Sequence, residues 1–288
     1  MRFKQAVNFM AVTLSVGAND VLAADLTIAR SNDQVVLTWP RATTNDFYVQ
    51  VATNLAPPPV WNSAADPATN ADTLAVTDPA AGPSQFYRLQ AWEVLFDGTN
   101  TAAFRSSASP LFPSNSWVVT SGTLASRVVP NATSLMTIDT YTNFELRFAW
   151  KCETNGNSGI FYRGNGNPEY QLFDDANVAS SPYRYVFANY TNETDLMGAV
   201  FGKIAPTNKT LVPTRQWNEC RIVVQGYHST HWLNGHLIID YQINDPAYGN
   251  YFTQATNTHV FIQNKGTGDD GVVPGVVYFR DIKIRSLP

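Results

Sequence analysis

No long segment of this chain places apolar residues at helical spacing, and this limits the possible folds more than any other feature. Val, Thr and aromatic residues occur instead in short alternating runs, such as QVVLTW, FYVQVA and QFYRLQ, which Pro, Asn, Asp and Gly residues separate. Runs of this length and period are typical of β-strands. With 288 residues, of which 44% are hydrophobic, the chain can bury one large core or two smaller ones. The sequence therefore predicts an all-β protein.

The charge distribution limits the kind of partner. Only 15% of the residues are charged, the formal net charge is −4, and no run of Lys or Arg residues occurs along the sequence. Binding to nucleic acid depends mainly on neutralising phosphates with Lys and Arg. We therefore expect a neutral or small partner and no nucleic acid.

The first residues have the pattern of a secretory signal peptide. Arg2 and Lys4 precede an apolar stretch that ends in small residues near Ala23 and Ala24. This stretch is too short and too interrupted to span a bilayer, and no later segment is long enough to do so. We expect residues 1–24 to be removed and the mature chain to be secreted, periplasmic or on the cell surface. An ordinary N-terminal helix is the alternative.

Residues 25–91 have the pattern of a small β-sandwich. Short alternating runs lie between Pro- and Asn-rich turns at the spacing that such sandwiches show. The segment resembles the fibronectin type III-like modules of exported bacterial proteins. It carries no constellation of ionisable residues, so we expect it to act as a spacer or an adhesion module.

The sequence pattern changes at residue 92. From there to residue 288 the chain carries, in order, LFDGTN, WVVTSGTL, YTNFELRFAWK, NSGIFYR, EYQLFD, RQWNECRIVVQG, HWLNGHLIIDY and YFRDIKI. In this order the motifs resemble the 3-keto-disaccharide hydrolase family, formerly a domain of unknown function. The resemblance implies a concanavalin A-like jelly-roll β-sandwich that follows the small one. It also implies a carbohydrate, in particular a 3-keto-glycoside, as the partner.

The stretch NSGIFYRGNGNPEYQLFD, residues 157–174, predicts a β-hairpin. With GNGNP as its loop, Arg163 lies opposite Glu169, Phe161 opposite Gln171, and Gly159 opposite Phe173. Alternation then places Ile160, Tyr162, Tyr170 and Leu172 on the core face. The other face is too polar to pack against a second sheet without ligands or water, so it predicts a solvent-facing, concave floor for a sugar. An ordinary ion pair between Arg163 and Glu169 on a wet sheet face is the alternative.

A second strand contributes to the same floor. In HVFIQNKG, His259, Phe261, Gln263 and Lys265 alternate with Val260, Ile262 and Asn264. Members of the family usually have Asp-His-Gly after this Gln, whereas the chain has Asn264, Lys265 and Gly266. The resemblance therefore implies that Lys265 replaces a His, or that the site does not turn over.

The family chemistry implies removal of the C2 proton of a 3-keto-glycoside and elimination at C1. Glu169 is then the expected base, and Arg163 and Lys265 stabilise the oxyanion. Asn157, Phe161, Gln171, Phe173 and Gln263 are expected to bind substrate. A two-carboxylate glycosidase would need a second acid facing Glu169. Two other classes stay open: a carbohydrate-binding or adhesion module on a degenerate site, and a structural surface protein that self-associates.

Four further groups of residues have weaker signals. Cys152 and Cys220 share the parity of core residues, so they form either a disulfide or two buried thiols. We expect no cofactor; Asp174 with Asp175, or Asp269 with Asp270, could bind Ca²⁺, but neither pair has the spacing of a dedicated loop. In HSTHWLNGH we expect Trp232 in the core and the three His residues at the surface or hydrogen-bonded.

Overall fold

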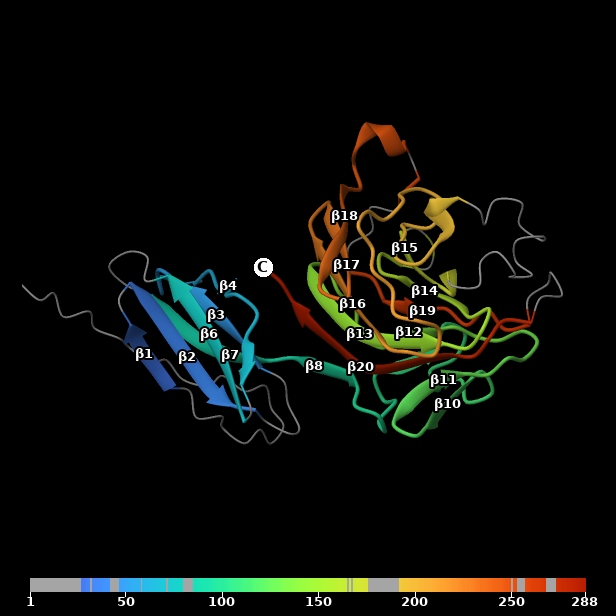
Figure 1. Ribbon diagram of the computed structural model, residues 1–288, viewed down its shortest axis with the longest axis horizontal. Helices are drawn as coiled ribbons and strands as arrows, with labels where there is room; N and C mark the ends of the chain where they lie inside the picture. The colour runs from blue at the N-terminus through green and yellow to red at the C-terminus, as the bar shows by residue number, and fades with distance from the viewer. Residues whose placement is uncertain are drawn as a thin grey trace, which may run out of the picture. The chain divides into compact units, whose positions relative to one another are not determined.

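The computed structural model of the chain describes residues 27–31, 33–41, 47–57, 59–70, 72–79, 85–164, 166, 168–175, 192–249, 251–252, 257–267 and 273–288 (Figure 1). The chain divides into two compact units. The first ends at Glu93 and includes Leu287 and Pro288, and the second comprises Val94–Ser286. The predicted boundary after residue 91 lies two residues before this division. The predicted signal peptide lies outside the described residues.

The first unit is a small β-sandwich of two antiparallel sheets. One sheet has the order β1-β2-β6-β5 and consists of β1 (Thr27–Ser31), β2 (Gln34–Pro40), β6 (Thr73–Pro79) and β5 (Ala68–Asn70). The other has the order β4-β3-β7 and consists of β4 (Asn62–Ser63), β3 (Phe47–Ala52) and β7 (Phe86–Ala91). Strict alternation in β2 buries Val35, Leu37 and Trp39 between the sheets.

The second unit is a larger β-sandwich. Its large sheet has the order β10-β11-β20-β13-β16-β17-β18, and β8 pairs with β20. The strands are β8 (Glu93–Phe96), β10 (Trp117–Thr120), β11 (Thr123–Ser126), β13 (Phe144–Cys152), β16 (Asn218–Gln225), β17 (His228–Leu233), β18 (His236–Gln242) and β20 (Val277–Ser286). In Figure 1, β20, β13 and β16 lie side by side, and β13 pairs with both neighbours.

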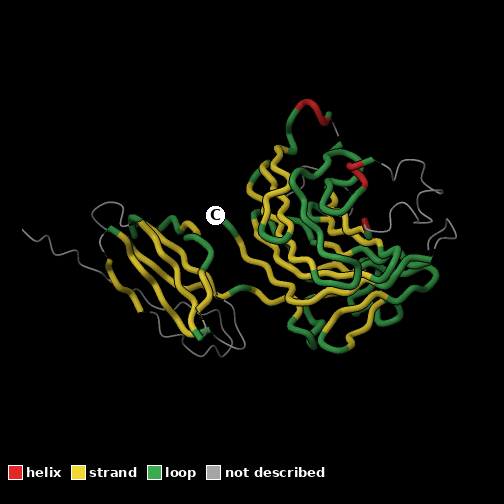
Figure 2. The backbone as a smooth tube through the Cα atoms, in the orientation of Figure 1, coloured by secondary structure: helices red, strands yellow, loops and turns green. Residues whose placement is uncertain are grey.

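The small sheet of this unit has five strands in the order β15-β14-β19-β12-β9. They are β15 (Glu169–Phe173), β14 (Asn157–Phe161), β19 (Phe261–Ile262), β12 (Leu135–Thr137) and β9 (Phe104–Ser106). The described helices are two short 3₁₀ segments, η2 (Glu193–Asp195) and η3 (Pro246–Tyr248), and strands and loops form the rest (Figure 2). The all-β fold and the concanavalin A-like jelly roll are therefore as predicted.

The core of the second unit lies between the two sheets. Phe144, Leu146, Phe148 and Trp150 alternate along β13 and contribute to it from the large sheet, and Ile160 and Leu172 contribute from the small sheet. Each fully buried side chain of this size stabilises the fold by roughly 1.5–3 kcal/mol. The core therefore fixes which residues of each strand face outward, and those residues form the surfaces described below. In the described part of the chain, no helix combines the length and the apolar character needed to cross a bilayer.

Candidate functional site

The β14–β15 hairpin forms, but its register differs from the prediction by two residues. Phe161 pairs with Glu169, Gly159 with Gln171, and Asn157 with Phe173. The predicted pairing of Arg163 with Glu169 is therefore wrong. The reason is that β14 ends at Phe161, so the connection starts at residue 162 instead of at Gly164. A shift of two residues keeps every side chain within β14 and β15 on its predicted face.

The core face of the hairpin is as predicted. Ile160, Tyr162, Tyr170 and Leu172 are each at most 1% exposed and belong to the core cluster of the second unit. We call the opposite face, formed by Asn157, Phe161, Glu169, Gln171 and Phe173, the site face.

The site face is covered, and the prediction of a solvent-facing floor is wrong. Glu169 is 6% exposed and Gln171 is 2% exposed. The segment around η2 lies against the edge of β15: the Gln171 amide Nε2 donates to the Asp195 carbonyl at 3.2 Å, and the Gln171 backbone N–H donates to the Ala199 carbonyl at 3.0 Å. A ligand would therefore have to bind in an enclosed space instead of on an open sheet.

Glu169 supplies the carboxyl of the site face, and its pKa is strongly shifted. Burial raises its pKa from 4.5 to about 8, and the charge of Lys265 acts in the opposite direction. Its Oε1 atom lies 1.8 Å from the position that a Cβ atom at Gly159 would occupy. Gly159 therefore leaves the space that the carboxyl fills. The charge of Lys265 acts on the Glu169 carboxyl, and the role of the pair stays a prediction.

Two groups that the sequence did not predict, the Asp195 carboxyl and the Tyr251 hydroxyl, lie near Glu169. The negative charges of Glu169 and Asp195 both raise the pKa of Tyr251, after the larger effect of burial. The Tyr251 hydroxyl donates to the Phe201 carbonyl. Burial also raises the pKa of Asp195. No motif marks either residue, because both come from connecting segments that only the fold brings to β15.

Arg163 is not part of this cluster. Its Nη2 atom donates to the Gly226 carbonyl at 2.5 Å and lies 3.4 Å from the Ser229 hydroxyl, both at the β16–β17 turn of the large sheet. Burial lowers the pKa of the guanidinium, and the charges of Tyr241 and Tyr162 oppose this effect. The expected position of Arg163 beside Glu169 is therefore wrong: beyond the end of β14 the alternation of the strand no longer directs its side chain.

The segment 263–266 joins the hairpin as expected. The Gln263 backbone N–H donates to the Gly159 carbonyl at 2.8 Å. The Asn264 side chain is buried on the other side and donates to the Ser116 carbonyl at 2.7 Å. Gly266 has a φ of +58°, and an added Cβ would lie 2.7 Å from the Val129 carbonyl oxygen. The backbone around Lys265 is therefore fixed on both sides.

Phe173, expected to bind substrate, lines a cavity at the other end of β15. The cavity has a volume of about 420 Å³, and Trp150, Asp174 and Thr214 also line it. The Trp150 Nε1 donor is buried without a hydrogen-bond partner. Glu169 does not line this cavity, so the carboxyl and the cavity mark the two ends of the site face.

The two cysteines are free and buried, so the disulfide alternative is wrong and the buried-thiol alternative holds. Cys220 pairs with Phe148 across β13 and β16, whereas Cys152 lies four residues further along β13, beyond the reach of a disulfide. Burial raises the pKa of both thiols.

The acidic pair predicted as a calcium site has protein partners. Asp174 accepts from the Thr214 hydroxyl at 2.9 Å, and Asp175 pairs with Lys209 at 2.6 Å. Within the described residues, no three His, Cys, Asp or Glu side chains gather into a metal-binding group. Asp269 and Asp270 lie outside the described residues.

His231 is hydrogen-bonded, one of the two environments predicted for it, whereas Trp232 does not lie in the core. His231 is fully buried, its Nε2 atom is 2.7 Å from the Tyr162 hydroxyl, and its Nδ1 atom is 2.9 Å from the Gly198 carbonyl. Because a carbonyl only accepts, Nδ1 carries the proton and Nε2 accepts from Tyr162. Trp232 faces outward, so the prediction of a core Trp232 is wrong. Ser229, His231 and Leu233 face the core in regular alternation along β17, so Trp232 lies on the opposite face. The extra residue at the register shift, Ile238, belongs to β18.

A jelly-roll β-sandwich with a buried carboxyl beside an ammonium group is the class of protein that the fold and the site define. The model of the 3-keto-alpha-glucoside-1,2-lyase-like domain matches residues 91–285, which is more than half of the chain. The chain belongs to this family, whose members are carbohydrate-active and hydrolase-like.

Individual proteins agree with this assignment. A 3-keto-disaccharide hydrolase of Bacteroides thetaiotaomicron is 27% identical over 189 residues, which cover 51% of this chain and 59% of that protein. Two crystal structures from Parabacteroides distasonis ATCC 8503, provisionally described as glycosyl hydrolases, share the fold. One is 22% identical with a TM-score of 0.54 and covers 68% of this chain and 94% of its own. The other is 23% identical with a TM-score of 0.50, and the match covers 69% of this chain and 100% of that chain.

Proposed function

We propose that the chain is an exported enzyme that cleaves 3-keto-glycosides by removing the C2 proton and eliminating the aglycone from C1. The observation that carries the proposal is the buried carboxyl of Glu169, whose pKa is raised to about 8 and which lies near Lys265. A general base works best when its pKa is close to the working pH. The family and the Bacteroides relative supply the substrate class.

In the proposed reaction, the ionised Glu169 carboxylate takes the proton from C2. The electron pair of that C–H bond forms the enolate of the C3 ketone, and the ammonium group of Lys265 stabilises the enolate oxygen. The enolate then expels the glycosidic oxygen from C1, which forms an enone. Addition of water to the enone completes the hydrolysis.

The departing oxygen needs a proton, and Tyr251 is the acid that we assign to this step. Its hydroxyl carries a proton at neutral pH, and the charge of Glu169 acts on it. The hydroxyl donates to the Phe201 carbonyl, so it has to rotate toward the departing oxygen to deliver this proton. Arg163 has no role in this scheme, because its guanidinium contacts Gly226 and Ser229 of the large sheet instead of the site face. Asn157, Gln171 and Gln263 position hydroxyl groups, and Phe161 and Phe173 offer ring faces to the sugar.

The test is release of 4-nitrophenol from 4-nitrophenyl 3-keto-glucoside by the purified chain. We expect release by the wild type, a loss of about 10²–10⁴-fold in Glu169→Gln because a general base is removed, and a smaller loss in Lys265→Ala. Lys209→Ala is the matched control, since Lys209 pairs with Asp175 instead. Undiminished release by Glu169→Gln would refute the assignment of the base.

A carbohydrate-binding module on a degenerate site is the second candidate. One observation favours it: Asn264 and Lys265 occupy the positions where the family usually has Asp and His. The Asn264 side chain donates to the Ser116 and Arg127 carbonyls. This candidate predicts no release of 4-nitrophenol, together with saturable calorimetric binding of an unoxidised disaccharide such as trehalose. Binding of the 3-keto-glucoside with turnover would exclude it.

Export is part of the proposal and rests on the sequence of residues 1–24. Expression of the full chain in a bacterium with a periplasm tests it. We expect the secreted or periplasmic product to begin at or near Ala24 or Asp25 by mass spectrometry. An uncleaved product that begins at Met1 in the cytoplasm would contradict it.

A further inference from the structure

The outer face of the large sheet gathers basic side chains that are scattered along the sequence. Because Leu146, Phe148 and Trp150 point into the core, the intervening residues of β13 point outward. The outer basic face, as we call it, comprises Arg147 and Lys151 on β13, Arg221 on β16, and Arg280, Lys283 and Arg285 on β20. It lies on the opposite side of the sandwich core from the site face and is separate from the proposed catalysis.

The register brings these residues next to one another. Arg147 pairs with Arg221 on one side and with Lys283 on the other. Adjacent strands are about 4.8 Å apart, and residues along a strand advance by about 3.3 Å, so the face extends roughly 10 Å across the three strands and about 16 Å along β20. It is therefore long enough to meet several successive groups of a chain-like ligand.

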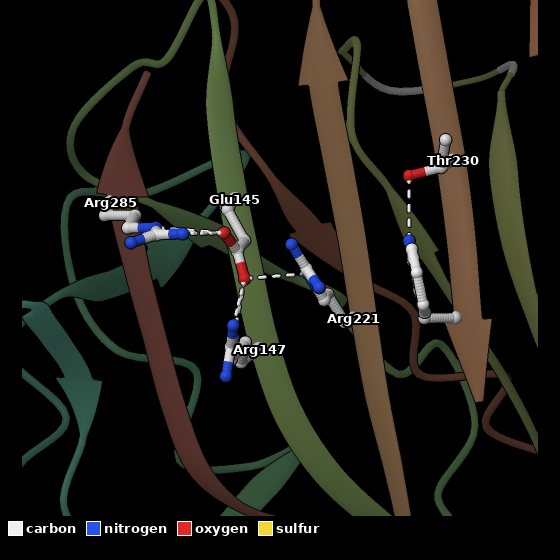
Figure 3. Close-up of polar contacts among 6 residues, drawn as sticks. Glu145, Arg147, Arg221, Thr230 and Arg285 are labelled. Atoms are coloured by element: carbon white, nitrogen blue, oxygen red, sulfur yellow. Dashed lines mark hydrogen bonds and ion pairs between the residues drawn. The ribbon is translucent and has the colours of Figure 1, made fainter. Parts of the chain in front are cut away.

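One buried carboxylate fixes three of the arginines. Glu145, only 1% exposed, lies 2.6 Å from Arg147 Nη2, 2.8 Å from Arg221 Nε and 2.5 Å from Arg285 Nη2 (Figure 3). One carboxylate therefore contacts guanidinium groups from three adjacent strands. The side chains of Arg147 and Arg221 keep 27% and 28% of their surface exposed. Glu145 therefore holds Arg147 and Arg221 in place while they still face water, whereas the Arg285 side chain, 5% exposed, is buried beneath the face.

Aromatic rings contact three cations of the face. The Arg221 guanidinium lies 4.9 Å from the centre of the Trp232 ring, whose Nε1 donates to the Thr230 hydroxyl. The Arg280 guanidinium lies 4.3 Å from the centre of the Trp217 ring, and the Lys151 ammonium lies 4.9 Å from it. Such contacts reduce the freedom of long side chains and lower the entropy cost of binding.

The charge of the face opposes that of the whole chain. Three acidic residues, Glu145, Glu219 and Asp281, lie on the same side of these strands as the six cations. The chain as a whole carries a formal charge of −4. A positive surface of this kind attracts polyanions.

We propose that the outer basic face binds a sulfated polysaccharide. A sulfate group has three oxygens that guanidinium groups on adjacent strands can share, as Arg clusters do with phosphate. The edges of Trp217 and Trp232 beside the cations suit the sugar rings between the sulfates. The face thus holds the protein on an anionic glycan without involving the sheet that carries the site face.

The test is affinity electrophoresis of the full chain through gels that contain dextran sulfate or uncharged dextran. We expect retardation by dextran sulfate alone, with an affinity that falls linearly on a logarithmic salt scale. Lys151→Gln/Lys283→Gln should weaken the affinity at least tenfold and lower the salt slope by about two, because it removes two cations outside the Glu145 cluster.

The matched control is Arg41→Gln/Lys203→Gln, which removes the same charge from positions outside the face: Arg41 lies in the first unit, and Lys203 follows the segment beside β15. We expect it to bind like the wild type. An equal loss in this control would show that net charge alone governs retention and would overturn the proposal. So would the absence of retardation, or equal retention by polygalacturonate or duplex DNA at the same charge concentration. Thermal unfolding of both variants verifies that they fold.

Discussion

The Oε1 atom of Glu169 occupies almost the position that a Cβ atom would take at Gly159, since the two points are 1.8 Å apart. The carboxyl thus lies across the neighbouring strand instead of beside its own register partner, Phe161. A glycine inside a strand often marks a close approach of another group. Here the glycine is explained by the space it gives to the carboxyl.

Gly159→Ala should therefore displace the Glu169 carboxyl. We expect at least a tenfold loss of 3-keto-glucoside cleavage, because a misplaced base loses the alignment on which proton transfer depends. The measurement is kcat/KM, together with the midpoint of urea unfolding.

The control for this prediction is the double variant Gly159→Ala/Glu169→Ala, in which nothing meets the new methyl group. Its free energy of unfolding should be higher than the two single changes predict by addition, because neighbouring changes couple. Simple additivity would show that the methyl group does not contact Glu169.

Lys265→Met should shift the pH dependence of cleavage. The charge of Lys265 lowers the pKa of Glu169, so its removal raises that pKa above about 8. The ascending limb of kcat/KM against pH, which reports ionisation of the base, should then move to higher pH. Lys209→Met should leave the limb in place, because its partner is Asp175. A limb that moves to lower pH would contradict the pairing of Lys265 with Glu169.

Alternation along strands allowed the sequence to predict much of the fold. The faces of Tyr162, Tyr170 and Leu172 depend only on a period of two, and they are as predicted. The register of the same hairpin depends on where β14 ends. The Gly- and Asn-rich sequence around residue 164 is compatible with turns at several positions. Pattern alone could not choose between them.

Strand parity and long-range contacts explain the other differences. Ser229, His231 and Leu233 face the core along β17, so Trp232 faces outward. Tyr251 and Asp195 come near Glu169 only through the packing of connecting segments. The outer basic face consists of residues from three strands that are far apart in the sequence, so no run of Lys or Arg announces it.

Both cysteines should resist alkylation in the folded protein. Burial raises the pKa of each thiol, and both side chains are at most 5% exposed, so little thiolate is accessible. Iodoacetamide should add no mass at pH 8 to the native chain and two carbamidomethyl groups after unfolding without reductant. An unfolded chain that needs reductant before it reacts would reveal a disulfide.

His231→Leu should destabilise the fold by about 2–4 kcal/mol, because it leaves the Tyr162 hydroxyl and the Gly198 carbonyl with one hydrogen bond fewer each in the core. His231→Leu should also weaken the dependence of the free energy of unfolding on pH below pH 6.5.

Burial lowers the pKa of His231 to about 3, so the unfolded chain binds a proton below about pH 6.5 that the folded chain does not. Wild-type stability therefore falls as the pH decreases from 6.5 toward 3. Urea unfolding between pH 4 and 7 measures this, and His228→Leu, at an exposed pair with Asp240, should change stability by less than about 1 kcal/mol.

Glu169→Gln should remove the opposite slope on the alkaline side. Burial raises the folded pKa of Glu169 to about 8 from 4.5, so between these values the folded chain holds a proton that the unfolded chain has lost. The free energy of unfolding of the wild type therefore falls as the pH rises through this window, by about 1.36 kcal/mol for each pKa unit at most. Glutamine does not titrate, so the variant should gain stability relative to the wild type from pH 5 to pH 9. Urea unfolding at a series of pH values measures the difference, and a difference that is constant over this range would mean that the carboxyl is hydrated and that its pKa is close to 4.5.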